Sequence, residues 1–385
     1  MRRFGGDLKP ELSSMNKKNI PLYKVNMPSG VAKIVAEVLN SGQIAGGPNI
    51  EKFEGLLRDY LGNPWVTTNG DVSTALTLCL YQAGVRPGDD VLMSPPVCLA
   101  TSCPVRNLFA NIRWCDVDPL TGNIDPQAIV KRITPRTKAI VVYHWAGNPA
   151  DLEAIYAVAR AHNLAVIEDA GEALGAEYHG KQIGATGSDY TVFSFYPNRH
   201  LTTLDGAAIA CAREEDFENL QWLKRYGIHQ PTFRTSDGEI NPASDIPVAG
   251  WNSYMNHVAA TIGVAQMAHL PSTIARYQEN GLYYDAALAA VPGVTILKRP
   301  VDSRSAYWVY TFLARERDDL LKRLRQQGVY ASKIHLRNDL YTCFGSGSEK
   351  LPGVDYFSAH SLSIPCGSWV SDEDRNYIVE AVVKE

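Results

Sequence analysis

Short apolar runs alternate with segments of helical periodicity between Trp65 and Ala212, and this alternation constrains the fold more than any other feature of the chain. Strands that alternate with helices favour an α/β fold with a largely parallel sheet. Ligands of such sheets bind at the edge where the strands reach their carboxyl ends. The residues that follow the apolar runs are therefore the candidates for a site, and they are Asp71 to Thr74, Pro95 to Thr101, His144 to Asn148, Asp169 to Glu172, and Ser194 to Thr203.

The alternation ends near Pro271, where a long helical segment precedes two strand-like runs and a closing helix. A chain of 385 residues is also long for one domain. We therefore expect a mobile tail over residues 1–18, a large α/β domain over residues 19–271 and a small C-terminal α+β domain over residues 272–385. The aromatic residues of SAYWVYT and YQENGLYYD are expected to form the core between the domains rather than a platform for stacking.

Charge and cysteine content argue against several classes of function. A net charge of −4 with 20% charged residues gives no basic surface for nucleic acid. The seven cysteines are scattered and include no CxxC pair, which argues against a zinc site and against a disulfide framework. No stretch supplies a signal peptide or the roughly 18 apolar residues of a membrane span. We expect a cytoplasmic protein that acts on a small molecule, without a metal or a membrane partner.

Asp169 ends the apolar run AVIE and is followed by small residues. An acid in this position can hold a cationic ring nitrogen, or it can cap the N-terminus of a helix, and both interpretations are open. Arg199 and His200 come after a later strand, and Ser194 stands at the end of that strand. Hydroxyls and backbone amides in this stretch can bind a phosphate.

Several longer motifs give the chain a resemblance to a known family. They read SGQIAGGPNIEKFE, AGVRPGDDVLMSP, ITPRTKAIVVYHWAGNPADL, VIEDAGEALGAEYHGKQIGATG, FSFYPNRHLTTLDG and GWNSYMNHVAATIGVAQMAHL. Together they resemble the vitamin-B6-dependent sugar aminotransferases of the DegT/StrS type, within the fold-type-I aspartate aminotransferase superfamily. This resemblance implies a mostly parallel seven-stranded sheet, a homodimer, pyridoxal phosphate or pyridoxamine phosphate as the cofactor, and a keto sugar, nucleotide sugar or cyclitol as the substrate.

The resemblance also implies roles for individual residues. Asp169 would hold the protonated pyridine nitrogen so that the ring acts as an electron sink. Glu172 stands near the ring hydroxyl, where the family usually has glutamine. The other implied roles are phosphate binding by Ser73, Thr74 and Ser194, contact with the cofactor phosphate of a second subunit by Asn252, a loop beside the cofactor formed by His144 and Gly147, and a place against the pyridine ring for Cys98, where many members have an aromatic residue.

The departures from the family pattern concern the reaction itself. The family's SFxxxK reads SFYPNR here, so Arg199 stands in the place of the lysine that forms a Schiff base with the cofactor. A guanidinium stays protonated and delocalised, and it can neither form that bond nor carry protons as a neutral amine. Val72 and Ala207 replace two glycines of the pattern. The charge that Glu172 adds beside the ring can be compensated by Arg199.

A lysine-free branch of the family, the keto-deoxysugar 3-dehydratases, has histidine at the lysine position and uses pyridoxamine phosphate. In this chain the histidine is His200, one residue later, and it is either a general base or a side chain that supports the site. His335 either contacts a sugar or nucleotide or serves the structure alone. Lys224 and Arg225 are expected on a solvated helix face.

Three hypotheses of function follow. The first is an enzyme that binds pyridoxal or pyridoxamine phosphate without a covalent bond and performs an elimination, or another reaction that needs no lysine, on a keto sugar or cyclitol. The second is a conventional sugar aminotransferase in which Arg199 replaces the lysine by engineering or recent loss. The third is a relative that has lost turnover. Val72 and Ala207 favour natural divergence, while Asp169, Ser194 and Asn252 argue against complete loss of the site.

Overall fold

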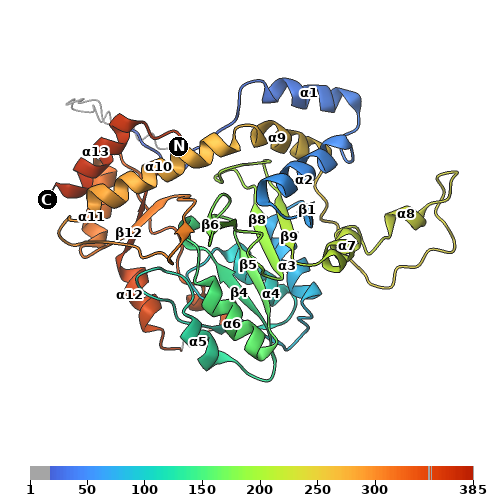
Figure 1. Ribbon diagram of the computed structural model, residues 1–385, viewed down its shortest axis with the longest axis horizontal. Coiled ribbons are helices and arrows are strands. Elements are labelled where there is room, and N and C mark those ends of the chain that lie inside the picture. Colours follow the sequence, from blue (N-terminus) through green and yellow to red (C-terminus); the bar gives the residue numbers. More distant parts are fainter. Residues whose placement is uncertain (1–17, 346, 348, 385) are drawn as a thin grey trace, which may run out of the picture.

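The computed structural model describes residues 18–345, 347 and 349–384. At its centre is a seven-stranded sheet in the order β1-β9-β8-β5-β4-β2-β3 (Figure 1). The strands are β1 (Val66–Asn69), β2 (Asp90–Met93), β3 (Asn111–Trp114), β4 (Thr137–Tyr143), β5 (Ala165–Asp169), β8 (Tyr190–Ser194) and β9 (Ala207–Cys211). Of these strands, β9 alone is antiparallel to its neighbours β1 and β8, and the other pairings are parallel. The predicted α/β fold with a mostly parallel seven-stranded sheet is confirmed.

Successive residues of a strand point to opposite faces of the sheet. Because the strands carry apolar residues on both faces, a layer of helices covers each face. In β5, Ile167 enters the core that contains α3, whereas Val166 enters the core that contains α2 and α6. Aspartates cap several of these helices, as Asp71 caps α3 by accepting from Thr74 N. The helices of this domain are α2 (Pro48–Leu61), α3 (Val72–Gln82), α4 (Leu99–Asn107), α5 (Pro126–Arg132), α6 (Leu152–His162), α7 (Glu214–Leu223), α8 (Gln230–Phe233) and α9 (His257–Met267).

A second, smaller unit surrounds an antiparallel sheet of β10 (Val294–Ile296), β12 (Tyr310–Ala314) and β13 (Ser361–Ile364). Its helices are α10 (Leu270–Leu288), α11 (Arg317–Gln326), α12 (Pro352–His360) and α13 (Asp372–Val383). The predicted domain boundary at residue 271 falls in the first turn of α10, which runs from α9 toward α13 (Figure 1). A further small sheet joins β6 (Glu177–Tyr178) and β7 (Lys181–Gln182) of the large domain to β11 (Ser303–Arg304).

The N-terminal segment joins the small unit, since Ile20 bridges to Val329 and is buried there. Residues 1–17 of the predicted tail lie outside the described residues, while Lys18 forms ion pairs with Glu373 and Asp374 of α13. Helix α1 (Val31–Ser41) follows, and α8 lies on a segment that projects from the body of the molecule (Figure 1). Within the described part of the chain, no helix has the length and apolar character that a membrane span requires.

Candidate active site

Asp169 is the last residue of β5, and its carboxylate is fixed at the carboxyl edge of the sheet. Oδ2 accepts a 2.6 Å hydrogen bond from the hydroxyl of Thr101 in α4, and Oδ1 accepts one of 3.0 Å from the backbone N–H of Gly171. Burial raises the pKa of Asp169, although both hydrogen bonds act in the opposite direction. The next α-helix in the described chain begins at Glu214, so the capping interpretation of Asp169 is wrong.

Two predicted residues lie close to this carboxylate. A Cβ atom on Gly171 would lie 3.1 Å from Asp169 Oδ1 and 3.3 Å from Ser194 Cβ, so the absence of a side chain at Gly171 lets both approach. Cys98 directly precedes α4. Burial raises the pKa of its thiol, and the carboxylates of Asp169 and Glu172 add to that rise. Asp169, Ser194, Cys98 and Glu172 therefore share one site.

Glu172 is buried and fully hydrogen-bonded. Its Oε2 accepts from Ala146 N at 2.9 Å, and its Oε1 lies 3.2 Å from His335 Nε2, which is also 3.0 Å from the Tyr143 hydroxyl. Burial alone would raise the pKa of Glu172, but the hydrogen bond from His335 and the guanidinium of Arg199 outweigh it and lower that pKa. Glu172 is thus a carboxylate, and His335 is a member of the site.

Arg199 lies at the same place with its guanidinium largely buried. Nη1 is 3.6 Å from Glu172 Oε1, and the side chain is 11% exposed. The guanidinium carbon lies 4.4 Å from the centre of the Trp308 ring, which in turn stacks on Tyr23 at 4.9 Å. Trp308 was expected to belong to the core rather than to a stacking platform. It does both, because its ring is buried and the guanidinium of Arg199 lies over it. The predicted proximity of Glu172 and Arg199 is present in the structure.

The loop that carries His144 and Gly147 lies beside the site, but the imidazole of His144 points elsewhere. Its Nδ1 accepts from Ala150 N at 3.1 Å, and its Nε2 is 3.0 Å from Glu168 Oε2. Glu168 precedes Asp169 in β5 and therefore faces the opposite side of the sheet. Gly147 has a φ of 87°, and a Cβ there would lie 2.7 Å from the carbonyl oxygen of Glu172. The loop contributes close backbone packing.

His200 turns away from the carboxylates. Its Nε2 donates to the carbonyl oxygen of Ala306 at 3.0 Å, and its ring lies against Tyr277. Burial lowers the pKa of His200 to about 4. This geometry favours the supporting role over the general base.

The N-terminus of α3 differs from the predicted phosphate cradle. Thr74 donates its backbone N–H to Asp71 Oδ1 at 2.8 Å and its hydroxyl to Asp71 Oδ2 at 2.7 Å. The carbonyl oxygen of Ser73 accepts from the hydroxyl of Thr77. Asp71 also raises the pKa of Asp205, after the larger effect of burial. An anion at this helix end would therefore have to displace the Asp71 carboxylate from Thr74.

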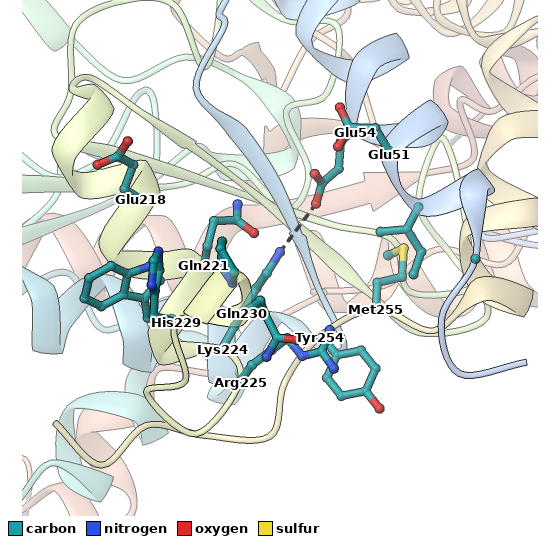
Figure 2. Close-up of a pocket in the computed structure, with 14 residues that line it drawn as sticks. Glu51, Glu54, Glu218, Gln221, Lys224, Arg225, His229, Gln230, Tyr254 and Met255 are labelled. Carbon is teal, nitrogen blue, oxygen red and sulfur yellow. Dashed lines mark hydrogen bonds and ion pairs between the residues drawn. The ribbon is translucent and has the colours of Figure 1, made fainter. Parts of the chain in front are cut away.

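Asn252 is exposed and bridges to Arg225. A cavity of about 550 Å³ lies there, with Arg225, Tyr254 and Lys224 in its lining (Figure 2). The expectation that Lys224 is solvated is wrong. Its ammonium is buried and contacts the Thr67 hydroxyl. It also lies 3.5 Å from Glu54 Oε1, and Figure 2 marks this pair with a dashed line.

Known proteins resemble the chain over nearly its whole length. A family model described as the DegT/DnrJ/EryC1/StrS aminotransferase family matches residues 29–383. The chain belongs to this family. It is 30% identical to the erythromycin biosynthesis sensory transduction protein EryC1 of Saccharopolyspora erythraea, over 92% of this chain and 95% of that protein. It is 29% identical to the dTDP-3-amino-3,4,6-trideoxy-alpha-D-glucose transaminase of Streptomyces venezuelae, over 90% of each.

Solved structures agree with this assignment. The sugar aminotransferase CalS13 from Micromonospora echinospora is 33% identical, with a TM-score of 0.89 over 94% of this chain and 99% of that chain. AtS13 from Actinomadura melliaura is 31% identical, with a TM-score of 0.90 over 95% and 99% of the two chains. The fold is therefore that of the fold-type-I enzymes of this family, which are aminotransferases dependent on pyridoxal phosphate.

The residues of this chain fit the ring end of that cofactor and fit its phosphate end less well. Asp169 provides a held carboxylate for a ring nitrogen, and Arg199 has buried nitrogen atoms, Nε and Nη1, without a hydrogen-bond partner among the described residues. At the phosphate end, Asp71 occupies the donors of Thr74. The chain thus has a site for the cofactor ring, but the carboxylate of Asp71 occupies the predicted phosphate site at the N-terminus of α3.

Five residues of the site were missed or left without a settled role by sequence reasoning. Thr101 and Tyr143 follow or end apolar runs, where the α/β rule already directs attention, and His335 had been considered. Trp308 and Tyr23 carried no signal of their own, because their contacts with Arg199 depend on how the small unit packs on the large one.

Proposed function

We propose that this protein binds pyridoxal or pyridoxamine phosphate without a covalent bond and acts on a keto sugar, nucleotide sugar or cyclitol in sugar or secondary-metabolite biosynthesis. The reaction is an elimination or another step that needs no lysine. The observation that carries this proposal is Arg199, which occupies the family's lysine position and lies buried 3.6 Å from the carboxylate of Glu172. A permanently charged guanidinium cannot take part in a Schiff base.

The residues of the site divide the remaining work. When bound, the cofactor supplies an electron sink for charge that develops on the substrate. Asp169 would hold the ring nitrogen in its protonated form, and Ser194 would hold the phosphate. His335 is the proton-carrying group that we assign, because an imidazole both donates and accepts protons and Nε2 already lies 3.2 Å from Glu172.

The substrate class rests on the relatives, and the assembly rests on Asn252. The transaminase of S. venezuelae is named for a dTDP-sugar, and GDP-perosamine synthase of Caulobacter vibrioides is 29% identical to this chain. We propose a nucleotide-linked or free keto sugar for this enzyme too.

We also propose a homodimer, because the exposed Asn252 has a cofactor role only across a subunit boundary. Light scattering at micromolar concentration tests this, and a monomer would remove that role.

The second candidate is a conventional sugar aminotransferase with arginine in place of lysine, and the names of the relatives favour it. The third candidate is a relative without turnover, and the retained Asp169 argues against it. Visible absorbance with added pyridoxal phosphate tests the proposal. A spectrum of free aldehyde that dialysis removes is expected, whereas a band that resists dialysis would mean a covalent bond to another lysine.

A further inference from the structure

The side chain of Arg199 is only 11% exposed, yet its Nε and Nη1 make no hydrogen bond to any residue that the structure describes. Its Nε and Nη1 atoms are inaccessible and without a partner, and the approach of Nη1 to Glu172, at 3.6 Å, is an ion pair beyond hydrogen-bond length. Arg317, with a similarly buried side chain, shows the contrast. It donates to Asp318 at 2.7 Å and to the carbonyl oxygens of Ser358 and Ser361 at 3.0 and 3.1 Å.

A buried cation with free donors is costly unless an acceptor completes it. Glu172 supplies an opposite charge but is not that acceptor, because its Oε1 stays 3.6 Å from Nη1, beyond hydrogen-bond length. Trp308 holds the guanidinium over its ring at 4.4 Å but accepts no hydrogen bond from it. The ring itself is anchored by its Nε1–H, which donates to the carbonyl oxygen of Asn198 at 2.5 Å. The guanidinium is therefore held in place by Trp308, while its Nε and Nη1 have no acceptor among the described residues.

We propose that Arg199 is the anchor of an anion subsite that takes the carboxylate of a ligand. This inference deepens the proposed function and rests on it for the identity of the site. A planar carboxylate matches one edge of the planar guanidinium with two parallel hydrogen bonds, one from Nη2 and the other from Nε or Nη1. A phosphate dianion matches the guanidinium less well. The carboxylate of Glu172 is only 3.6 Å from Nη1, and it repels a ligand with two negative charges more strongly than a ligand with one.

Two sources of such a carboxylate share this chemistry. One is a sugar acid, which would bring its carboxylate on the keto sugar itself. The other is an amino acid that donates the amine. Both place a carboxylate beside the ring end of the site, where Asp169 and Glu172 lie, and both need the cation that replaces the family's lysine.

The test is titration calorimetry with glutarate, a dicarboxylate, and with its neutral diamide as the matched probe, with and without pyridoxamine phosphate. We expect glutarate to bind and the diamide to bind at least ~10-fold more weakly, because the amide lacks the charge-assisted pair. Arg199→Gln should weaken glutarate binding ~10-fold or more, and Arg199→Lys ~3-fold or more, since lysine keeps the charge without the fork. Arg136→Gln, at an exposed arginine, is the control and should change nothing.

Other results would overturn the inference. Equal glutarate affinity in Arg199→Gln, or no glutarate binding to the native protein, would remove the subsite. Inorganic phosphate that binds more tightly than glutarate, and that is lost in Arg199→Gln, would replace the carboxylate by a phosphate. If Arg199→Gln does not fold, as judged by circular dichroism, Arg199→Lys decides. To separate ligand sources, glucuronate and glutamate are compared, and the tighter one names the source.

The outcome is separable from that of the proposed function. Cofactor binding is read independently from its absorbance. Retained cofactor without glutarate binding would sink the subsite alone. Glutarate binding without cofactor binding would sink the proposed function alone.

Discussion

Thr101 donates a 2.6 Å hydrogen bond to Asp169, and this bond ties α4 to the end of β5. The hydroxyl fixes one carboxylate oxygen while the backbone of Gly171 fixes the other. Because the acid is buried and its pKa is raised by that burial, these donors and the nearby guanidinium are what favour its charged form. The neighbours of Asp169 therefore offset part of the rise in its pKa that burial causes.

Replacing Asp169 by alanine should weaken binding of pyridoxamine phosphate by about 10- to 150-fold. The protonated ring nitrogen would lose a charge-assisted hydrogen bond of about 1.5–3 kcal/mol. Thr101→Val keeps the carboxylate but removes one of its donors, so a smaller loss is expected. Titration calorimetry measures both, and unchanged affinity in Asp169→Ala would show that the carboxylate does not hold the ring.

Arg199→Lys should give a visible absorbance band that survives dialysis after addition of pyridoxal phosphate, because lysine can form the covalent bond that arginine cannot. Arg199→Gln, which has no amine to offer, is the control and should show only free cofactor. Full aminotransferase activity in Arg199→Lys, with none in the native chain, would favour the conventional enzyme. Loss of a native reaction would mark Arg199 as a working residue.

Asp71→Ser should tighten the binding of pyridoxal phosphate by about 3- to 10-fold. The change removes a negative charge from the N-terminus of α3 and frees the hydroxyl of Thr74, while serine still caps the helix through the Thr74 N–H. Asp125→Ser, at the cap of α5, is the matched control. Equal affinities in the native protein and in Asp71→Ser would mean that the phosphate binds elsewhere.

His200 should make the protein less stable in mild acid. Its pKa falls from an ordinary value of 6.5 to about 4 in the folded state. Above pH 6.5 the imidazole is neutral in both states and contributes nothing. As the pH falls from 6.5 to about 4, the unfolded state takes up a proton that the folded state refuses, and the free energy of unfolding drops by up to about 3 kcal/mol.

Urea denaturation at pH 8 and pH 5 measures this effect. His200→Gln, which can still donate to the Ala306 carbonyl, should lose less stability between the two pH values than the native protein does. His162→Gln, at the exposed end of α6, should behave as the native protein. The same pH dependence in His200→Gln and the native protein would place the titrating group elsewhere.

The strands were predictable because apolar runs such as that ending at Asp169 are bounded by turns and separated by helical segments. The reversed direction of β9 was not, since Ala207–Cys211 reads like any buried strand. The burial of Lys224 was missed for a related reason. A lysine near a helix end reads as solvated, and only the tertiary structure brings Glu54 and Thr67 to it.

The candidate site was predictable where its residues follow strands. Asp169, Glu172 and Ser194 do so, and Arg199 lies a few residues further along, where the family pattern directs attention. His335 comes from the other unit, and no local pattern connects it with Glu172 at 3.2 Å. The capping interaction of Asp71 with Thr74, and its conflict with a phosphate there, became visible only in the structure.

Tyr23 stacks on the ring over which Arg199 lies, and three residues earlier Ile20 is bonded to Gly328. The N-terminal segment is thus bonded to the small unit at Ile20, and it contacts the site at Tyr23. A truncation or a fusion that disturbs this segment acts as a change to the active site, even though it touches none of the family's motifs there.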